Sequence, residues 1–364
     1  ALQSTLTTNT SSELIIGGGQ VAGLGSIVNE GSITAHATSF LVGIENRGTL
    51  KTFNNVSITG ALTTTPSSVI TIPANDSVVA NGLYVTENFT NHGLIELTSE
   101  ASVNFQSALL VGGGSGLFTN APTGTLRAMT GTNPGGRYLY ASVVNQGTLQ
   151  VQASLDITDS TYQTALVHIG TIVVESDAVL NIPNGIEIND LGTVSLATNA
   201  SLNVSRLYGN LQTSPAFSGG GRIVVSSQIE VFSDDRGANQ IGFTNNSSLG
   251  ALEISGSVQL LDVSDNANGS LPEALYADTL ILGLNSTLDL NGYKVYVRSF
   301  VDQGGAVLNG QIEVVPLLLS KTSILENQPV NSLIGRFSHF DASLSPEMQY
   351  ELIGGDNSAF QIIN

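Results

Sequence analysis

The chain has 364 residues, of which 29 are acidic and 11 are basic, so its formal net charge is −18. So few cations cannot neutralise a phosphate backbone, and anionic lipid surfaces repel the same charge, so we expect binding to neither nucleic acid nor membranes. Cysteine is absent, which excludes disulfides, thiolate zinc sites and thiol nucleophiles. No apolar run approaches the ~18 residues that a membrane-spanning helix requires, so we expect no membrane insertion.

The polar residues are mainly Ser, Thr and Asn, and charged residues make up only 11% of the chain. Ser, Thr and Asn compete for backbone hydrogen bonds and are poor helix formers, whereas Val, Ile and Thr favour strands that end at Gly, Asn and Asp turns. No segment shows convincing 3.6-residue periodicity. The sequence therefore predicts an all-β protein.

A repeat runs along most of the chain. We expect residues 1–19 to form an N-terminal lead or cap with a short apolar strand over residues 12–16. An Asn-x-Gly turn followed by an alternating strand then recurs, at residues 27–33, 44–50, 89–95 and 143–149. The glycines at 124, 147, 170 and 192 are 23, 23 and 22 residues apart.

A period of ~20–30 residues that contains two or three short strands is typical of a solenoid. The sequence predicts a right-handed parallel β-helix over residues 20–316, with roughly eleven or twelve coils and a length on the order of 55 Å. Leu, Val and Ile should point inward, and Ser, Thr and Asn outward. Glycine and asparagine should occupy corners that need a positive φ or a side-chain ladder. A β-sandwich or barrel, a propeller and a calcium β-roll are the competing folds.

One coil gives a specific register. We expect Val194, Leu196, Leu202 and Val204 to point inward together. They should stack near Val173 and Leu180 of the preceding coil.

The turns and strand ends of the predicted β-helix resemble a known group of proteins. The Asn-x-Gly-Thr-Leu turn and the segment Thr287-Leu-Asp-Leu-Asn-Gly292 are similar to the rods of large bacterial surface proteins of the filamentous-haemagglutinin and autotransporter-passenger type. The resemblance implies an extracellular or cell-surface, secreted protein that serves as a stalk, adhesin or fibre subunit and is not an enzyme.

A second resemblance covers residues 317–364. Ser323-Ile-Leu-Glu-Asn-Gln-Pro329, Ile334-Gly-Arg-Phe-Ser-His-Phe-Asp341 and Tyr350-Glu-Leu-Ile-Gly-Gly-Asp356 resemble the first half of a cadherin-like repeat. In that family such residues bind calcium between tandem domains. Glu326 matches the family's glutamate and Asp341 its first aspartate, whereas Ser343 replaces the second aspartate. The resemblance implies a partial β-sandwich-like domain with a calcium site at Glu326 and Asp341.

Catalytic chemistry has one candidate. Many parallel β-helices cleave polysaccharides with clustered carboxylates and a cation. Asp234, Asp235 and Arg236 form the one dense acid–base cluster, and a lyase or hydrolase that uses the two aspartates is the alternative to a structural role. The histidines at 36, 92, 168 and 339 are scattered, and the downstream His-Gly and Arg-x-Lys segments of pectin-cleaving enzymes are missing.

Two further sites are weaker. Asp262, Asp265, Asn266 and Asn268, followed by Gly269, form an oxygen-rich loop like a calcium loop. Counted from Gly269 in the place of the EF-hand glycine, Glu273 is two positions short of the bidentate ligand. Tyr138 and Tyr140 follow Gly135-Gly136-Arg137 and form an aromatic cluster in a predicted loop, where a sugar could stack. The ligand itself is unknown.

The predicted partners are other copies of the chain or surface glycans and proteins of a host or neighbouring cell. The apolar strand over residues 12–16 of one molecule could add to the incomplete sheet of residues 317–364 in the next. Such a head-to-tail contact does not close and makes a filament.

Overall fold

The computed structural model describes residues 1–75, 80–102, 105–133, 135–160, 166–189, 191–210, 216–244, 246–266 and 271–315. The strands of these ranges belong to one compact unit, Ala1–Pro316. This unit ends where the sequence analysis places the end of the β-helix. The expected cadherin-like segment, with Glu326 and Asp341, lies outside the described residues.

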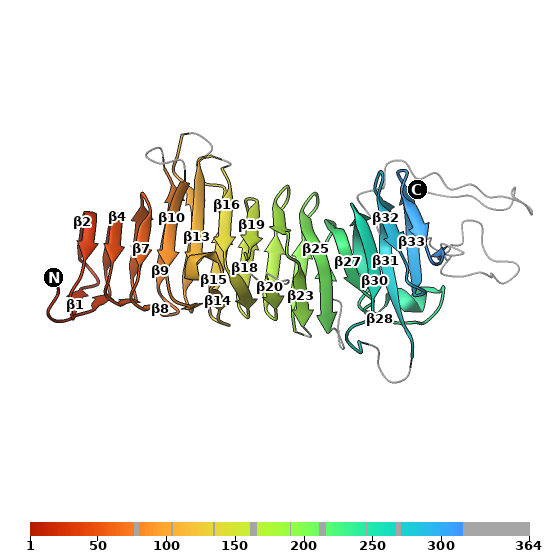
Figure 1. Cartoon of the computed structure of the whole chain (residues 1–364), viewed down its shortest axis with the longest axis horizontal. Helices are drawn as coiled ribbons and strands as arrows, with labels where there is room; N and C mark the ends of the chain where they lie inside the picture. The colour runs from red at the N-terminus through yellow and green to blue at the C-terminus, as the bar shows by residue number, and fades with distance from the viewer. Residues whose placement is uncertain are drawn as a thin grey trace, which may run out of the picture. The chain divides into compact units, whose positions relative to one another are not determined.

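The unit is a parallel β-helix. In Figure 1 its strands lie side by side along the long axis of the unit, from β2 (red) to β33 (blue). Almost every pairing between described strands is parallel and joins a strand to its equivalent in the next coil. The exception in this part of the chain is the short strand β28 (Ser233–Asp234), which runs antiparallel to β31. The predicted fold class is therefore confirmed.

The strands stack in three columns. Column 1 contains β1 (Leu6–Thr8), β3 (Ile27–Asn29), β5 (Ile44–Asn46), β8 (Leu62–Thr64), β11 (Phe89–Asn91), β14 (Leu117–Asn120), β17 (Ser142–Asn145), β20 (Leu166–His168), β23 (Ile186–Asn189), β30 (Ser257–Leu261), β32 (Thr287–Asp289) and β34 (Ala306–Leu308). Column 2 contains β2 (Glu13–Val21), β4 (Ser32–Phe40), β6 (Thr49–Phe53), β9 (Val69–Ala74), β12 (Leu94–Ser99), β15 (Thr125–Ala128), β18 (Thr148–Val151), β21 (Thr171–Val174), β24 (Thr193–Leu196), β26 (Phe217–Ser218) and β35 (Ile312–Val314).

Column 3 contains β7 (Val56–Ile58), β10 (Ala80–Val85), β13 (Gln106–Val111), β16 (Arg137–Tyr140), β19 (Leu155–Thr158), β22 (Val179–Ile182), β25 (Ser201–Asn210), β27 (Arg222–Glu230), β29 (Leu249–Ile254), β31 (Glu273–Leu282) and β33 (Lys294–Asp302). Longer strands turn a corner and serve two columns. For example, β4 pairs with both β6 and β7, and β27 pairs with both β29 and β30. Two short 3₁₀ turns, η1 (Gly112–Gly114) and η2 (Gln240–Phe243), interrupt the connections.

Coil length varies more than the glycine spacing indicates. Asn29 and Asn46 occupy equivalent positions 17 residues apart, whereas Glu96 and Arg127 are equivalent at a separation of 31 residues. Twelve successive parallel pairings along column 3, from Gln20 to Val301, give thirteen rungs within the described residues. This is slightly more than the eleven or twelve coils expected, because the first coils are short.

The ladder also starts earlier than residue 20. Strand β1 pairs in parallel with β3, and β2 pairs with β4 over most of its length. Residues 6–21, expected as part of a lead or cap, therefore already form rungs of the β-helix.

Alternation along each strand places one apolar core inside the coils. Val194, Leu196, Leu202 and Val204 are all buried, as predicted, and Leu202 lies in register with Leu180. Val173 is wrong as a core neighbour. It pairs with Ser195 on the outward face, while Ile172 and Val174 lie inside opposite Val194 and Leu196. Because side chains alternate between faces, an error of one residue exchanges inside for outside.

The glycines of the Asn-x-Gly turns are needed for a reason other than the one expected. Asparagines at several corners do have positive φ, such as Asn54 and Asn199. Gly48, Gly147 and Gly170 do not. A Cβ on any of these three would come within about 2 Å of a backbone oxygen of the preceding coil, at 2.1 Å for Gly48 and 2.2 Å for Gly147. Close packing of successive turns, rather than a left-handed conformation, therefore requires glycine there.

Candidate functional site

Polar side chains form a ladder inside column 1, which we call the asparagine ladder. It consists of Thr8, Asn29, Asn46, Thr64, Asn91, Asn120, Asn145 and His168, all buried. Thr8 Oγ1 donates to Asn29 Oδ1 at 2.6 Å, and Asn29 Nδ2 donates to Asn46 Oδ1 at 2.7 Å. Each amide also reaches a backbone carbonyl of the following turn, as Asn29 Nδ2 does to Thr49 O at 2.8 Å. The ladder thus ties successive coils together at the corner that follows column 1.

The second part of the ladder repeats this pattern. Asn91 Nδ2 donates to Asn120 Oδ1 at 3.0 Å, and Asn120 Nδ2 donates to Asn145 Oδ1 at 2.8 Å. Asn145 Nδ2 lies 3.1 Å from His168 Nδ1, and His168 Nε2 lies 3.0 Å from Thr193 O. An amide nitrogen only donates and a carbonyl oxygen only accepts, so these contacts select the neutral Nε2–H tautomer of His168. Burial lowers the pKa of His168 to about 4, although the bond to Thr193 O acts in the opposite direction.

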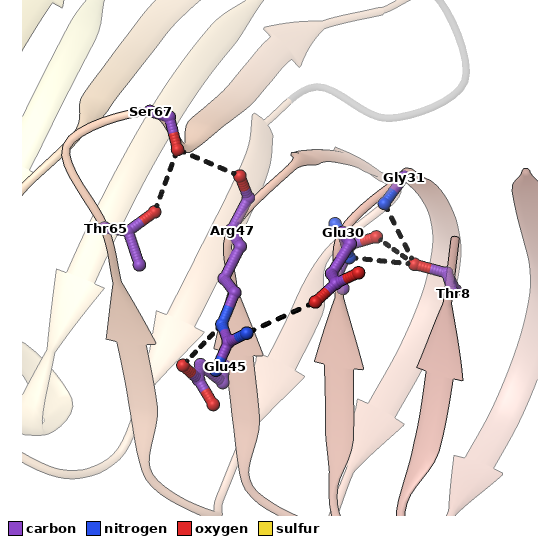
Figure 2. A network of polar contacts seen from close by, with 8 residues as sticks. Thr8, Glu30, Gly31, Glu45, Arg47, Thr65 and Ser67 are labelled. Carbon is purple, nitrogen blue, oxygen red and sulfur yellow. Dashed lines mark hydrogen bonds and ion pairs between the residues drawn. The ribbon is translucent and has the colours of Figure 1, made fainter. Parts of the chain in front are cut away.

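The ladder begins at Thr8, which belongs to the network of polar contacts that Figure 2 shows. Thr8 Oγ1 accepts from the backbone nitrogens of Glu30 at 3.2 Å and Gly31 at 3.1 Å. Outside the coil, Arg47 forms ion pairs with Glu45 at 2.7 Å and Glu30 at 3.2 Å. All three of these charged side chains are well exposed, so the pairs add little to stability. The buried contacts of Thr8 carry the structural role.

The three histidines that the structure describes do not come together in one site. His36 stacks on Phe53 with ring centroids 4.8 Å apart. His92 lies in an exposed turn, and His168 is buried in the ladder. His339 lies outside the described residues.

The predicted acid–base cluster is folded into a loop whose charged groups already have protein partners. Asp234 is buried and pairs with Arg236, whose Nη2 donates to its Oδ2 at 2.9 Å. Arg236 Nη1 also donates to Thr244 O at 2.9 Å. Asp235 Oδ1 accepts from Tyr296 Oη at 2.9 Å and from Gly237 N at 2.9 Å. The two aspartates are therefore directed to different partners.

Two tyrosines fasten this loop to the outer face of the last coils. Tyr276 Oη donates to Gly237 O at 3.0 Å and accepts from Arg236 N at 2.9 Å. Tyr276 also stacks on Tyr296 and meets Phe243 edge-on, which forms a small apolar cluster separate from the main core. Burial raises the pKa of Tyr276 to about 12. The hollow of about 420 Å³ beside this loop is open and is lined by Arg236, Gln240, Ile241 and Thr244. The arrangement holds a loop in place.

The weaker calcium loop is organised around a residue that the sequence analysis missed. Asp262 and Asp265 are exposed, while the neighbouring backbone turns its N–H groups towards Glu230. Glu230 Oε1 accepts from Val263 N at 3.1 Å and from Ser264 N. Asn268 lies outside the described residues. In the ranges that the structure describes, no three His, Asp or Glu side chains are grouped so as to hold a metal ion.

Glu230 is only 1% exposed. Burial raises the pKa of its carboxyl group, whereas the N–H groups of Ser264, Gly209 and Val263 lower it. The carboxylate of Glu230 also accepts hydrogen bonds from Gly209 N at 3.2 Å and from Asn266 Nδ2 at 3.3 Å. The signal in the sequence is a single glutamate within the apolar run Ile229-Glu-Val-Phe232. A buried carboxylate needs such donors, but the sequence does not show that they come from a loop about 30 residues later.

The tyrosines singled out by the sequence lie on a strand rather than in a loop. Tyr138 and Tyr140 are both on β16, with rings nearly parallel at 7° and centroids 5.7 Å apart. One line on the outer face contains Tyr84 of β10, Leu110 of β13 and Tyr140 of β16. Each of these residues is in register with the next, one coil further along. Tyr84 is 37% exposed, and Tyr138 and Tyr140 are half-buried. We call Tyr84, Tyr138 and Tyr140 the tyrosine platform.

A buried cation supports the platform from below. Arg137 is fully buried at an inward position of β16, and burial lowers its pKa to about 10. Its guanidinium donates to backbone carbonyls, including Met129 O at 2.9 Å and Thr130 O at 2.7 Å. Asn81, at the equivalent inward position two coils earlier, likewise donates to Pro73 O at 2.7 Å. Polar residues thus hold the corner loops that lead into the strands of the platform.

No helix among the described residues is long and apolar enough to cross a membrane. No protein-family model, curated protein or solved structure matches this chain.

Proposed function

We propose that the chain is a non-catalytic structural segment of an extracellular bacterial surface protein, serving as a stalk, adhesin or fibre. The observation that supports this most is the continuous parallel ladder of Ala1–Pro316, whose first half is reinforced inside by the asparagine ladder. Its partners are other copies of the chain, or glycans and proteins of a neighbouring cell surface.

A spacer must keep its length under thermal motion. Each coil is joined to the next by backbone hydrogen bonds in up to three columns and by stacked apolar side chains. In the first half, the buried amides add a fourth line of contacts, and a coil that moved away would leave them without partners, at a cost of ~1–3 kcal/mol for each group. The acidic exterior keeps such a rod soluble and reduces nonspecific contacts.

Stiffness can be measured because the chain has no cysteine of its own. Thr49 and Thr193 lie six coils apart at equivalent outward positions of column 2. Spin labels on Thr49→Cys and Thr193→Cys should give one narrow distance distribution centred at roughly 29 Å between the two backbones, from ~4.8 Å per coil. A matched pair one coil apart, Thr171→Cys and Thr193→Cys, controls for label motion. A broad distribution for the long pair alone would contradict a stalk.

The competing proposal is a polysaccharide-active enzyme that uses Asp234 and Asp235. It has less support, because Asp234 is paired with Arg236 and Asp235 accepts from Tyr296. We expect no depolymerisation of a broad panel of acidic and neutral polysaccharides. Cleavage that is lost in both Asp234→Asn and Asp235→Asn would establish the enzyme instead.

Calcium binding at Glu326 and Asp341 is proposed from the cadherin-like resemblance. Oxygen ligands of this kind suit Ca²⁺, and a bound ion should raise the melting temperature by mass action. Glu326→Gln should abolish the rise, whereas Asp262→Asn should leave it unchanged. The reverse result would place calcium at the loop of Asp262 and Asp265. A melting temperature indifferent to millimolar calcium and to chelator would contradict both sites.

Head-to-tail assembly is proposed for the fibre role. Sedimentation velocity should then show larger species as the concentration rises, and deletion of residues 1–16 should prevent them. A chain that stays monomeric at high concentration would contradict the filament.

A further inference from the structure

We propose that the tyrosine platform of Tyr84, Tyr138 and Tyr140 is a binding site for neutral oligosaccharides. This role goes beyond a stalk, and it can fail without affecting the stalk proposal.

The rings of Tyr84 and Tyr138 lie flat because glycines leave room beneath them. A Cβ added to Gly82 would lie 2.8 Å from the ring of Tyr84, and one added to Gly136 would lie 2.5 Å from the ring of Tyr138. Each tyrosine is therefore folded back over the glycine two residues before it on the same face. In this position a ring covers the strand with one face and can present the other to a ligand. Tyr84 keeps 37% of its surface exposed in this arrangement.

The spacing suits a chain of repeating units. Tyr84 and Tyr140 occupy equivalent positions two coils apart, which corresponds to ~10 Å along the axis. Leu110 lies between them in the same line. Tyr138 lies beside this line, in register with Ala108. A linear oligosaccharide running along the axis would meet two aromatic rings in one line, with a third at its side. The C–H face of a pyranose ring is apolar and packs on aromatic rings, and tyrosine offers a rigid apolar surface with a polar tip.

Polar groups border the platform on the side of the next coil. Asp156 of β19 lies in register with Tyr138, and Thr158 lies in register with Tyr140. Asn181 Nδ2 donates to Asp156 Oδ1 at 2.6 Å, which holds this carboxylate in place. A fixed carboxylate and a hydroxyl group are the kind of partners that sugar hydroxyls need.

Charge selects among glycans. Asp156 and the formal net charge of −18 both disfavour uronates, sialylated chains and nucleic acids. Arg137 does not offset them, because its guanidinium is buried and bound to backbone carbonyls. The occupant that fits the platform is therefore a neutral glycan.

The test is titration calorimetry of the full chain with cellohexaose, mannohexaose, laminarihexaose and, as the acidic probe, oligogalacturonate. At least one neutral hexasaccharide should bind, and oligogalacturonate should bind more weakly than it. Tyr138→Ala should weaken binding roughly tenfold or more, as expected for truncation of an aromatic anchor. Tyr138→Phe should keep the affinity within about threefold, because the ring surface is retained. Tyr208→Ala changes a tyrosine on another coil and should have no effect.

Several outcomes would overturn the proposal. Absence of binding across the panel would do so and would leave a protein as the occupant of this face. Preference for oligogalacturonate would contradict the charge argument. Affinity unchanged in the double variant Tyr84→Ala and Tyr138→Ala would place the sugar elsewhere. The distance between labels at residues 49 and 193 serves as the independent check, since it should be the same in all of these variants.

Discussion

His168 takes the place of an asparagine in the ladder, with its Nδ1 3.1 Å from Asn145 Nδ2. Four of the preceding rungs, those of Asn29, Asn46, Asn91 and Asn145, have the turn Asn-x-Gly, and this rung reads His168-Ile-Gly170. The imidazole accepts from the rung before it and donates to Thr193 O at 3.0 Å. It therefore performs the two functions of an amide, but only while it is neutral. A proton on Nδ1 would face the Asn145 N–H with a second donor.

The first prediction concerns pH. The pKa of His168 is about 4 in the folded chain and 6.5 when unperturbed. Between these values the unfolded state binds a proton that the folded state does not, so the free energy of unfolding falls as pH decreases from 6.5 towards 4. The full effect is about 3 kcal/mol, and above pH 6.5 the stabilisation is complete. Urea unfolding measured at steps between pH 7 and 4.5 should show this slope.

The matched variant is His168→Asn, which introduces the residue found at five of the seven other rungs and does not titrate. The free energy of unfolding of the wild type minus that of the variant should fall as the pH decreases from 6.5 towards 4, and it should stay constant above pH 6.5. A difference that stays constant over that range would show that His168 does not control it.

The second prediction concerns the amides. Asn120→Ala should lower the free energy of unfolding by about 2–4 kcal/mol, because it removes the donor to the buried Asn145 Oδ1 and to Thr148 O, and one of the acceptors of Asn91 Nδ2. Asn88→Ala is the control. Asn88 is exposed and accepts one bond, from Leu117 N at 2.9 Å, so its loss should cost less than about 1 kcal/mol. Equal effects of the two variants in urea unfolding would contradict a structural role for the ladder.

The third prediction separates close packing from backbone conformation. Gly147→Ala places a methyl group 2.2 Å from Gly124 O, so the coils must move apart. We expect a loss of roughly 2 kcal/mol or more in the free energy of unfolding. Gly220 also lacks a positive φ, and a methyl group there would meet Thr198 Oγ1 at an ordinary 3.5 Å. Gly220→Ala should be neutral or slightly stabilising, because alanine restricts the unfolded chain. Similar melting temperatures for both variants would refute this packing argument.

The fourth prediction tests the register of one coil. Leu202 is fully buried, so Leu202→Asp should destabilise the chain by roughly 3–5 kcal/mol through an unpaired buried charge. Val173 lies on the outward face, so Val173→Asp should cost less than about 1 kcal/mol. The comparison is made by urea unfolding at pH 7. A costly Val173→Asp with a tolerated Leu202→Asp would reverse the two faces.

The sequence by itself determined the parallel β-helix, because a solenoid repeats one local pattern and each strand meets only its neighbours in the adjacent coils. The Asn-x-Gly turns indicated the corners and a side-chain ladder there, and alternation identified Leu202 and its companions as core. The expectation that asparagine points outward was wrong for the ladder, whose asparagines are buried inside the coils and hydrogen-bonded to one another and to backbone carbonyls. Each of these inferences depends on residues within one period of one another.

Tertiary structure decided what depends on the length of each coil. Coils of 17 to 31 residues bring Tyr84 into line with Tyr140 and place the loop of Val263 and Ser264 around Glu230. No local pattern predicts these lengths, because a corner can take in extra residues without disturbing the strands on either side of it. For the same reason the neighbours Asp234 and Asp235, which look like a pair in the sequence, are bound by Arg236 and by the distant Tyr296. The sequence shows which side chains face outward, and the stacking of the coils decides which of them meet.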